Sequence, residues 1–494
     1  MRLHESWNAR WRWQPRRGDR VAGTKQVLGQ TRRIHFVGIG GSGMNGIAEL
    51  LVNMGYAVSG SDLQQTTTTE RLASLGVRVQ HGHAAEHVTD ADVVVVSSAI
   101  SPTNPEVIEA RRRGLPVIPR AEMLAELMQR HSGIAVAGAH GKTTTTSMIA
   151  MTLDHAGLDP TAVIGGRLSA FGSNARLGRG QWMVVEADES DRSFLKLSPT
   201  VAVITNIDYE HLEAYSSFDD LQQAFIDFAN KVPFDGAVVL CADDEHLRGS
   251  RSRLARRVVT YGLDAGADVT AHDIVLDGLH ASCTVRRTMV EPRTGMVSNL
   301  AVGRLQLSVP GRHNLQNALA AIAVGAELGI PFDTMAQALE QFRGVDRRFQ
   351  VIGEAGGVTV VDDYGHHPTE IRAVLDVARA QRPARLIVVF QPHRYTRTRQ
   401  LLSSFGAALG GADEVVLTDI YAAGEEPIAG VTIDALAEAV RGAGRQAVQV
   451  LRSLGEVPAH VAARAQTGDM VIMLGAGSIG AWAPRVLEAL RARR

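Results

Sequence analysis

The fold of the central part of this chain is decided by the stretch Gly138-Ala139-His140-Gly141-Lys142-Thr143-Thr144. It follows a short apolar run at residues 134–137 and precedes a helical pattern at residues 147–156. In this position the loop amides can cradle phosphate oxygens, Lys142 can reach the β- and γ-phosphates, and the Thr143 hydroxyl can ligate Mg²⁺. The usual spacing has a glycine where Val136 stands, so the loop is a shortened variant. It predicts an α/β domain that binds ATP.

Two polar clusters follow neighbouring apolar runs downstream of this loop. Glu186–Asp191 (EADESD) ends the run at residues 182–185, and Asn206–His211 (NIDYEH) ends the run at residues 201–205. Each cluster alone could be a solvated turn. Because ligands gather at the carboxyl ends of parallel strands, their shared position favours a joint role. Carboxylates and a neutral imidazole suit Mg²⁺, so the clusters predict metal ligands beside the phosphate loop.

A second glycine loop lies near the start of the chain. Gly38–Gly43 (GIGGSG) fits the pattern G-x-G-x-x-G between a strand at residues 34–38 and a helix at residues 43–54, and Asp62 follows the next strand. The pattern indicates a bound diphosphate but does not separate NAD from a UDP-sugar. Another match, at residues 475–480, leaves no room for a full βαβ unit, so it predicts only a tight turn.

The alternation of strand, polar turn and helix divides the chain into three α/β blocks, at residues 32–119, 120–342 and 343–494. Alternating residues at 258–309 predict antiparallel strands, and an Ala-rich helix is expected at 314–328. Apolar runs at 357–361, 386–390, 414–418 and 470–474 predict a third parallel sheet.

Composition excludes several classes of protein. The formal net charge of −1 creates no global field that favours nucleic acid or an anionic membrane, and no apolar run reaches the roughly 18–20 residues of a membrane helix. Two cysteines in 494 residues cannot form a disulfide framework, and this agrees with the reducing environment of the cytoplasm. Tryptophans and arginines interleave in the first 31 residues. We expect a disordered tail there, with a helix on a membrane surface or on nucleic acid as the alternative.

With these stretches assembled, the chain resembles the Mur ligases from about residue 32 to its C-terminus. The motifs that carry the resemblance are GIGGSGM (38–44), SSAIS (97–101), GAHGKTTTT (138–146), EADESD (186–191), NIDYEHLE (206–213), GRHNLQNA (311–318), DDYGHHPTE (362–370) and FQPHRYTRT (390–398). Two departures are mild: Ala139 stands where Thr is frequent, and Glu210 stands where Asp is frequent.

The resemblance implies a three-domain α/β architecture. It has an N-terminal Rossmann-like UDP-binding domain, a central P-loop ATPase domain and a C-terminal Rossmann-like domain that receives the amino acid. It further implies an ATP- and Mg²⁺-dependent ligase of peptidoglycan synthesis, from the branch that joins L-alanine to UDP-N-acetylmuramate through an acyl phosphate. Such an enzyme is expected in the cytoplasm, as a monomer or weak homodimer, without nucleic-acid partners or membrane insertion.

The resemblance also implies roles for individual residues. Lys142 binds phosphates, Thr143, Glu186 and His211 hold metal, His313 and Asn317 face the adenine, and Arg348 reaches the phosphates. The UDP-substrate side comprises Gly38, Gly40, Gly41, Ser42, Gly43, Met44, Asp62, Ser97 and Ser98. The acceptor side comprises Tyr364, His366, His367, His393, Arg394 and Arg397, with His366 and His367 as candidate bases for the amine.

Three alternatives remain open at this point. A sister ligase that attaches a preformed murein tripeptide would share most of these motifs. A nicotinamide-dependent oxidoreductase would use the loop at 38–43 and Asp62 but would leave the phosphate loop idle. A non-catalytic nucleotide-binding scaffold would not consume ATP.

Overall fold

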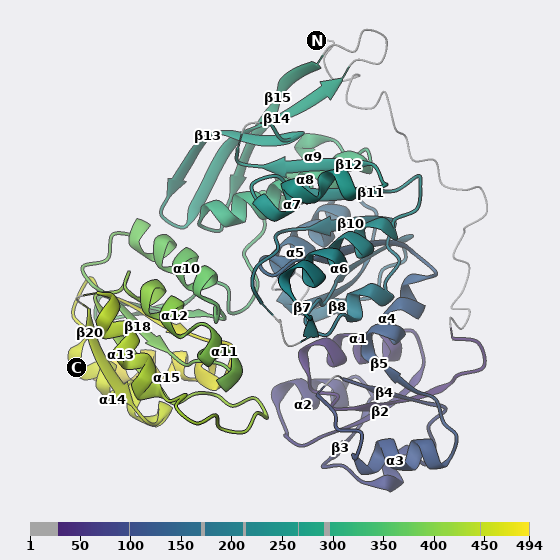
Figure 1. Cartoon of the computed structure of the whole chain (residues 1–494), viewed down its shortest axis with the longest axis horizontal. Helices are drawn as coiled ribbons and strands as arrows, with labels where there is room; N and C mark the ends of the chain where they lie inside the picture. Colours follow the sequence, from purple (N-terminus) through teal and green to yellow (C-terminus); the bar gives the residue numbers. More distant parts are fainter. Residues whose placement is uncertain are drawn as a thin grey trace. The chain divides into compact units, whose positions relative to one another are not determined.

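The computed structural model describes residues 28–97, 99–168, 173–210, 214–264, 266–290, 297–444 and 446–493. Residues 1–27, most of the expected N-terminal tail, lie outside these ranges. The chain forms three sheets and divides into two compact units (Figure 1). The first unit holds the five- and ten-stranded sheets. The second holds the six-stranded sheet and comprises residues 276–281, 309–313 and 344–494. Among the described residues, no helix is long and apolar enough to cross a membrane.

The N-terminal sheet is parallel and has the strand order β3-β2-β1-β4-β5. Its strands are β1 (Arg33–Val37), β2 (Ala57–Asp62), β3 (Arg78–His81), β4 (Val93–Val96) and β5 (Val117–Pro119), and its helices are α1 (Ser42–Asn53), α2 (Thr67–Ser74), α3 (Pro105–Arg112) and α4 (Arg120–Met128). The strand order reverses between β1 and β4, which is where open α/β sheets bind ligands. The predicted glycine loop follows β1 at this point, so its position in the fold is confirmed.

A buried carboxylate ties the N-terminal sheet to α3. Glu106 is fully buried and accepts a hydrogen bond from Ser61 at 2.6 Å. Its oxygens also lie 3.2 Å from Nδ1 of His83 and 2.5 Å from Nδ1 of His87. Burial would raise the pKa of Glu106, but the hydrogen bonds from His35, Ser61 and His87 outweigh it and lower the pKa to about 2. The charged form of Glu106 is therefore the one that the fold stabilises.

Replacing this carboxylate is expected to loosen the N-terminal sheet. Because the folded-state pKa lies below the ordinary value, the stabilisation is complete above about pH 4.5 and disappears as the pH falls toward 2. Glu106→Gln should lower the free energy of unfolding at pH 7 by about 3 kcal/mol and flatten its acid dependence between those limits. Hydrogen exchange of the β1 amides measures the change. Glu109→Gln is the control, because Glu109 is on the same helix and pairs with exposed Arg112. Equal effects of the two variants would contradict the assignment.

The ten-stranded sheet has the order β15-β14-β13-β12-β11-β10-β6-β9-β7-β8. Its strands are β6 (Ser132–Ala137), β7 (Thr161–Leu168), β8 (Ser173–Arg176), β9 (Trp182–Glu186), β10 (Val201–Ile204), β11 (Ala237–Cys241), β12 (Val258–Gly262), β13 (Val269–Asp277), β14 (His280–Val290) and β15 (Val297–Leu307). Its helices are α5 (Lys142–His155), α6 (Phe218–Asn230), α7 (Glu245–Ser250), α8 (Arg312–Glu327) and α9 (Phe332–Glu340). Strand β6 lies between β10 and β9 and pairs parallel with both.

One prediction for this sheet is wrong in part. The alternating pattern at residues 258–309 predicts antiparallel strands, yet β12 pairs parallel with β11 and with β13. The pairing with β13 involves only Tyr261–Val269 and Gly262–Thr270, where the end of one strand lies beside the start of the next. This two-residue pairing has no helix between its strands, so the sequence lacks the strand–helix–strand pattern that would indicate parallel pairing.

The C-terminal sheet has the order β16-β17-β21-β18-β19-β20. Its strands are β16 (Gln350–Ala355), β17 (Val358–Asp363), β18 (Leu386–Phe390), β19 (Glu414–Thr418), β20 (Ala447–Leu451) and β21 (Met470–Leu474), and its helices are α10 (Pro368–Ala380), α11 (Tyr395–Gln400), α12 (Leu402–Leu409), α13 (Ile433–Ala443), α14 (Val457–Arg464) and α15 (Ala483–Arg491). The pattern predicts only parallel strands, but β16 is an antiparallel edge strand. Its turn into β17 uses Gly356 and Gly357, which have φ values of 59° and 74°.

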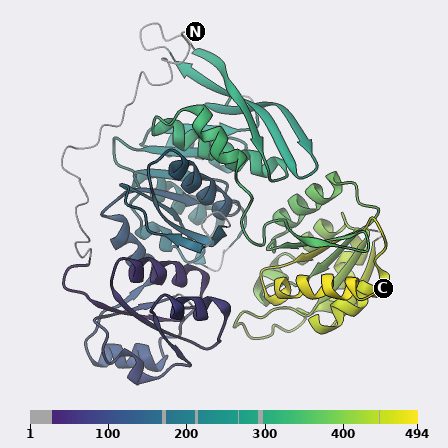
Figure 2. The ribbon, with the colours of Figure 1, turned by 180° about the vertical axis from the view of Figure 1, so that it is seen from behind.

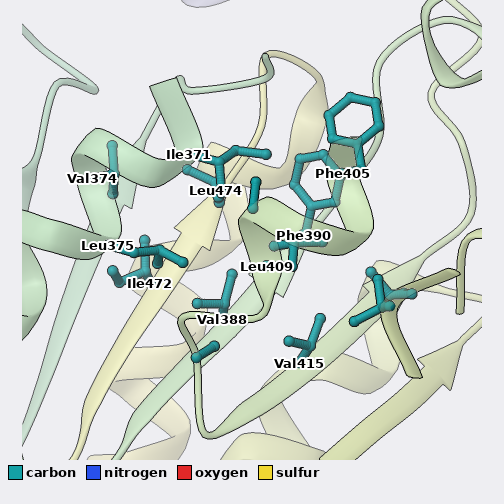
Figure 3. Close-up of a cluster of buried hydrophobic side chains, with 14 of the residues drawn as sticks. Ile371, Val374, Leu375, Val388, Phe390, Phe405, Leu409, Val415, Ile472 and Leu474 are labelled. Carbon is teal, nitrogen blue, oxygen red and sulfur yellow. The ribbon is translucent and has the colours of Figure 1, made fainter. Parts of the chain in front are cut away.

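Alternate strand residues of this sheet bury on opposite faces. Figure 3 shows one face, where Val388 and Phe390 of β18 pack with Ile371 of α10 and Phe405 of α12. On the other face, Val389 packs with residues of α14 and α15. Figure 2 shows α15, in yellow, along the sheet. Helices on both faces explain why these strands read as continuous apolar runs.

Candidate active site

The phosphate loop connects β6 to α5 and requires glycine at both ends. Gly138 has a φ of 135°, and a Cβ there would lie 2.1 Å from the Thr205 hydroxyl. Gly141 has a φ of 80°, and a Cβ there would lie 2.7 Å from the side-chain oxygen of Asn317. Because α5 begins at Lys142, the loop amides lie at a helix N-terminus, where anions are favoured.

The end of β10 fastens this loop. The Thr205 hydroxyl and the Asn206 amide group both donate to the carbonyl oxygen of His140, at 2.6 and 3.0 Å. The backbone amide of His140 donates back to the Asn206 side chain at 2.8 Å. The His140 ring then bonds the Asp208 carboxylate through Nε2 at 2.9 Å. The second polar cluster therefore supports the loop directly.

The Lys142 ammonium lies inside the loop that carries it. It donates to the carbonyl oxygens of Gly138 at 2.6 Å and Ala139 at 3.2 Å, and to the Glu189 carboxylate at 2.7 Å. The ion pair is nearly inaccessible to solvent, with 15% of the Lys142 side chain and 2% of the Glu189 side chain exposed. Carbonyl and carboxylate oxygens therefore occupy the positions around the Lys142 ammonium that phosphate oxygens would take in a nucleotide complex.

The protonation of this pair follows from its burial. Burial alone would lower the pKa of Lys142, but Glu189 and Glu186 outweigh it, so the pKa lies above the ordinary value and the ammonium stays charged. Burial raises the pKa of Glu189 to about 7, although Lys142 opposes the shift. Glu189 can therefore take up a proton near neutral pH if Lys142 leaves it.

Two of the three predicted metal ligands, Thr143 and Glu186, follow or end neighbouring strands of the sheet. Glu186 ends β9, pairs with Val136 next to the phosphate loop, and accepts a hydrogen bond from the Gly165 amide at 2.8 Å. A Cβ at Gly165 would lie 2.5 Å from this carboxylate, so a larger residue there would displace it. Thr143 is in the first turn of α5. His211, the third predicted ligand, lies outside the described residues.

The glycine loop of the N-terminal domain is held by its neighbours on β2. The amides of Gly38 and Ile39 donate to the carbonyl oxygen of Ser61 at 2.8 and 3.0 Å. The Gly40 amide donates to Asp62 at 2.9 Å, so this carboxylate closes the loop. A small cleft beside it is lined by residues including Asp62, Thr69 and His81.

The other predicted residues on this side differ in what they can offer. The Ser97 hydroxyl lies 3.9 Å from where a Gly38 Cβ would be, and Gly41 begins α1 as its N-cap. Met44 is 1% exposed, so its side chain packs inside the domain. Ser98 and the Ser42 side chain lie outside the described residues.

Helix α8 contacts the phosphate loop through Asn317. The side-chain oxygen of Asn317 accepts a hydrogen bond from Thr145 at 3.1 Å and lies against Gly141. His313 lies one turn earlier on the same helix face, although it belongs to the second compact unit. Burial and the nearby Arg348 lower the pKa of His313 to about 4, so its ring is neutral at pH 7.

In the second unit, the motif at residues 362–370 surrounds a buried carboxylate. Asp363 accepts hydrogen bonds from the Phe349 amide at 2.6 Å and the Gly365 amide at 2.7 Å. Burial raises its pKa to about 6, against the pull of Arg348. The Arg348 guanidinium lies 5.2 Å from the centre of the Tyr364 ring and 3.3 Å from Glu370.

Predicted acceptor residues gather beside this motif. The His366 ring makes edge contacts with Tyr364 and His393, at centroid distances of 5.4 and 5.8 Å. Arg397 lies 3.3 Å from Nδ1 of His393. Arg394 has a φ of 72°, a costly value for a residue with a Cβ, and its amide donates to Tyr421 at 2.8 Å.

The two predicted base candidates have different surroundings. His367 is the N-cap of α10, and its Nδ1 accepts the Thr369 amide at 3.4 Å. Nδ1 of His366 lies 3.1 Å from the Tyr364 carbonyl oxygen, so a proton on Nδ1 leaves Nε2 with its lone pair. Burial lowers the pKa of His366 well below its ordinary value, although Glu370 opposes the shift.

Sequence reasoning assigned no individual role to several residues that the structure places at these sites. Glu189 binds Lys142, Asp208 binds His140, and Asp363 holds two backbone amides. Glu189 and Asp208 lie in the two polar clusters described above, so their position directly after a strand is the sequence feature that could have identified them. Arg120, which bonds Asp188 at 2.8 Å, gives no motif signal.

Family comparisons agree with this organisation. The profile described as "Mur ligase family, catalytic domain" matches residues 33–132, "Mur ligase middle domain" matches residues 136–325, and "Mur ligase, glutamate ligase domain" matches residues 347–477. Together the matches cover most of the chain.

Curated relatives and solved structures are similar over nearly the whole length. A UDP-N-acetylmuramate–L-alanine ligase from Anaeromyxobacter sp. (strain Fw109-5) is 54% identical over 93% of this chain and 98% of its own. The ligase of the same name from Geobacter sulfurreducens is 52% identical over 92% and 96%. The structure of a UDP-N-acetylmuramate–alanine ligase from Thermotoga maritima matches with a TM-score of 0.79 and 31% identity, over 94% of this chain and 100% of that one. The structure of a murein peptide ligase from Psychrobacter arcticus matches with a TM-score of 0.68 and 27% identity, over 93% of this chain and 99% of that one.

Proposed function

The chain belongs to the Mur ligase family, and we propose that it joins L-alanine to the carboxylate of UDP-N-acetylmuramate while ATP is converted to ADP and phosphate. The observation that carries this proposal is the 54% identity, over 93% of the chain, to a relative named for that reaction. The phosphate loop supports the ATP-dependent step, because its lysine and helix N-terminus suit a triphosphate. A nicotinamide-dependent oxidoreductase would have no use for this loop, and a non-catalytic scaffold would bind ATP without consuming it.

The choice of L-alanine over a murein tripeptide rests on two comparisons. Relatives named for L-alanine addition are 51–54% identical to this chain. The alanine ligase structure also matches more closely than the murein peptide ligase, with TM-scores of 0.79 and 0.68. Because both ligases share the fold, we expect residues on the acceptor side to determine whether L-alanine or the tripeptide is used.

The reaction needs ATP because a carboxylate has no leaving group for an amine to displace. Transfer of the γ-phosphoryl group to the muramoyl carboxylate gives an acyl phosphate, whose leaving group is phosphate. The alanine amine then forms the amide. Two anions must approach in the first step, and the Lys142 ammonium offsets their repulsion once it turns from Glu189 to the phosphates. The proposed role of Arg348 is to approach the same phosphates.

The residues fit a magnesium site. Thr143 and Glu186 offer oxygen ligands next to the phosphate loop, and His211 is proposed as a further ligand. When bound, Mg²⁺ neutralises charge on the phosphates. Gly165 holds the Glu186 carboxylate in place through its amide, so the donor is oriented before the ion arrives.

On the acceptor side we assign His366 as the base that takes the amine proton. Its ring is neutral at pH 7 because burial lowers its pKa, and Nε2 has the free lone pair when Nδ1 donates to Tyr364. Arg394 and Arg397 are proposed to bind the alanine carboxylate, which suits a planar guanidinium. Tyr364, His367 and His393 would line the same side.

The remaining assignments are proposals of the same kind. Residues 32–119 form the UDP-substrate domain, with Gly38–Met44 at the diphosphate, residues 120–342 form the ATP domain, and residues 343–494 form the amino-acid domain. His313 and Asn317 face the adenine. The enzyme works in the cytoplasm as a monomer or weak homodimer.

Phosphate release tests the proposed function. The full chain is incubated with ATP, Mg²⁺ and UDP-N-acetylmuramate, and then with L-alanine or the murein tripeptide. We expect release that depends on L-alanine. Release only with the tripeptide would assign the chain to the sister ligase, and release with neither would contradict the assignment to this reaction.

A further inference from the structure

One arginine of the N-terminal domain lies between the glycine loop and the carboxylate cluster of the ATP domain. Arg120 is the first residue of α4 and follows β5, so it lies at the same edge of the parallel sheet as the loop after β1. A Cβ at Gly43 would lie 2.6 Å from Nη1 of Arg120 and 2.8 Å from its Cζ. The guanidinium therefore lies directly against the loop.

The same guanidinium forms an ion pair with the ATP domain. Nη2 of Arg120 donates to Asp188 at 2.8 Å, and the arginine side chain is 17% exposed. Asp188 stands between Glu186 and Glu189 in the chain, and Glu189 binds Lys142.

A second set of contacts links the same two loops. In helix α1, which follows the glycine loop, Glu49 accepts a hydrogen bond from Ser173 of β8 at 2.8 Å, and Asn45 bonds Asn174. Strand β8 pairs with β7, and Gly165 of β7 donates to Glu186. Both routes lead from the glycine loop to the carboxylates beside the phosphate loop.

We infer that Arg120 is a positioning residue that couples the binding of the UDP-sugar to the binding of ATP, by contacting the diphosphate at the glycine loop while it holds Asp188. The inference rests on the proposed function, because it takes the diphosphate of UDP-N-acetylmuramate as the ligand of that loop. A guanidinium has five donors and can serve a phosphate and a carboxylate together. When the diphosphate binds, Arg120 contacts both the diphosphate and Asp188. Its hold on Asp188 changes, and the carboxylate cluster beside Lys142 moves with Asp188.

The coupling can be measured by calorimetry on the full chain. The Kd of UDP-N-acetylmuramate is determined with and without a non-hydrolysable ATP analogue and Mg²⁺. We expect the analogue to tighten binding in the wild type by a factor in the usual range of about 5–150. Arg120→Gln should weaken binding of UDP-N-acetylmuramate alone roughly tenfold and bring the coupling factor to about 1.

A second variant separates coupling from simple loss of affinity or of folding. Asp188→Asn keeps the Arg120 charge, so it should bind UDP-N-acetylmuramate alone at least as tightly as the wild type, yet lose the coupling. Arg112→Gln is the matched control, because Arg112 is 70% exposed and pairs with Glu109 on its own helix. This variant should leave both the Kd of UDP-N-acetylmuramate and the coupling factor unchanged.

The outcomes distinguish the two levels of the account. If the wild type does not bind UDP-N-acetylmuramate, the proposed function fails and the coupling fails with it. If the wild type binds and turns over this substrate but shows no coupling, only the inference about Arg120 is overturned. It is also overturned if the Arg120→Gln and Asp188→Asn variants keep the wild-type coupling factor.

Discussion

The Lys142→Ala variant is expected to form the amide product at least 100–1000-fold more slowly than the wild type, as is typical when a charge-stabilising donor is removed. The ammonium is the cation that the phosphate loop itself supplies, and it lies among the carbonyl oxygens of Gly138 and Ala139. Without it, the loop loses the ammonium charge that offsets the approach of the γ-phosphate to a carboxylate. Steady-state phosphate release with saturating ATP, UDP-N-acetylmuramate and L-alanine measures the loss.

The fold should survive this substitution. The variant leaves Glu189 without its cation, but burial raises the pKa of Glu189 to about 7, so the side chain can become neutral by taking up a proton. Thermal unfolding checks this point. Lys196→Ala is the matched control, since Lys196 is 45% exposed and pairs with Glu122 at the surface of the same unit. Comparable losses in the two lysine variants would contradict the role of Lys142.

The Glu186→Gln variant is expected to need more Mg²⁺ and to turn over more slowly. The amide keeps the shape of the side chain and an oxygen for the Gly165 amide, but it removes the charge that favours a divalent cation. We expect the Mg²⁺ concentration at half-maximal rate to rise about tenfold or more and the maximal rate to fall about 100-fold. A Mg²⁺ titration of phosphate release gives both numbers.

The control for this variant is Glu245→Gln. Glu245 is 79% exposed and starts the short helix α7 in the same unit, so its loss should leave the Mg²⁺ dependence unchanged. An unchanged Mg²⁺ dependence in Glu186→Gln would show that this carboxylate is not a metal ligand.

The phosphate loop could be predicted from sequence because all of its determinants are local. A buried strand, two glycines and a helix follow one another within residues 132–155. The fastening of the loop could not be predicted in the same way. Thr205 and Asn206 lie 65 and 66 residues from His140, and only the pairing of β6 with β10 brings them together. Sequence patterns indicated that polar residues end β10, but not which atoms they bind.

The features that sequence reasoning missed have no periodic signal. Strand β16 follows Arg347 and Phe349, which both have positive φ values, and its turn depends on two glycines. Arg120 follows a strand of only three residues and bonds Asp188, which lies 68 positions further along the chain. The first feature depends on single backbone conformations, and the second depends on a tertiary contact.

The transfer of an isotope tests the central claim most directly. UDP-N-acetylmuramate labelled with ¹⁸O at the muramoyl carboxylate is incubated with the full chain, ATP, Mg²⁺ and L-alanine, and the released phosphate is analysed by mass spectrometry. If ATP activates the carboxylate as an acyl phosphate, one ¹⁸O atom passes to phosphate for each amide formed. Amide formed together with unlabelled phosphate, the lost ¹⁸O atom leaving in water, would contradict the account.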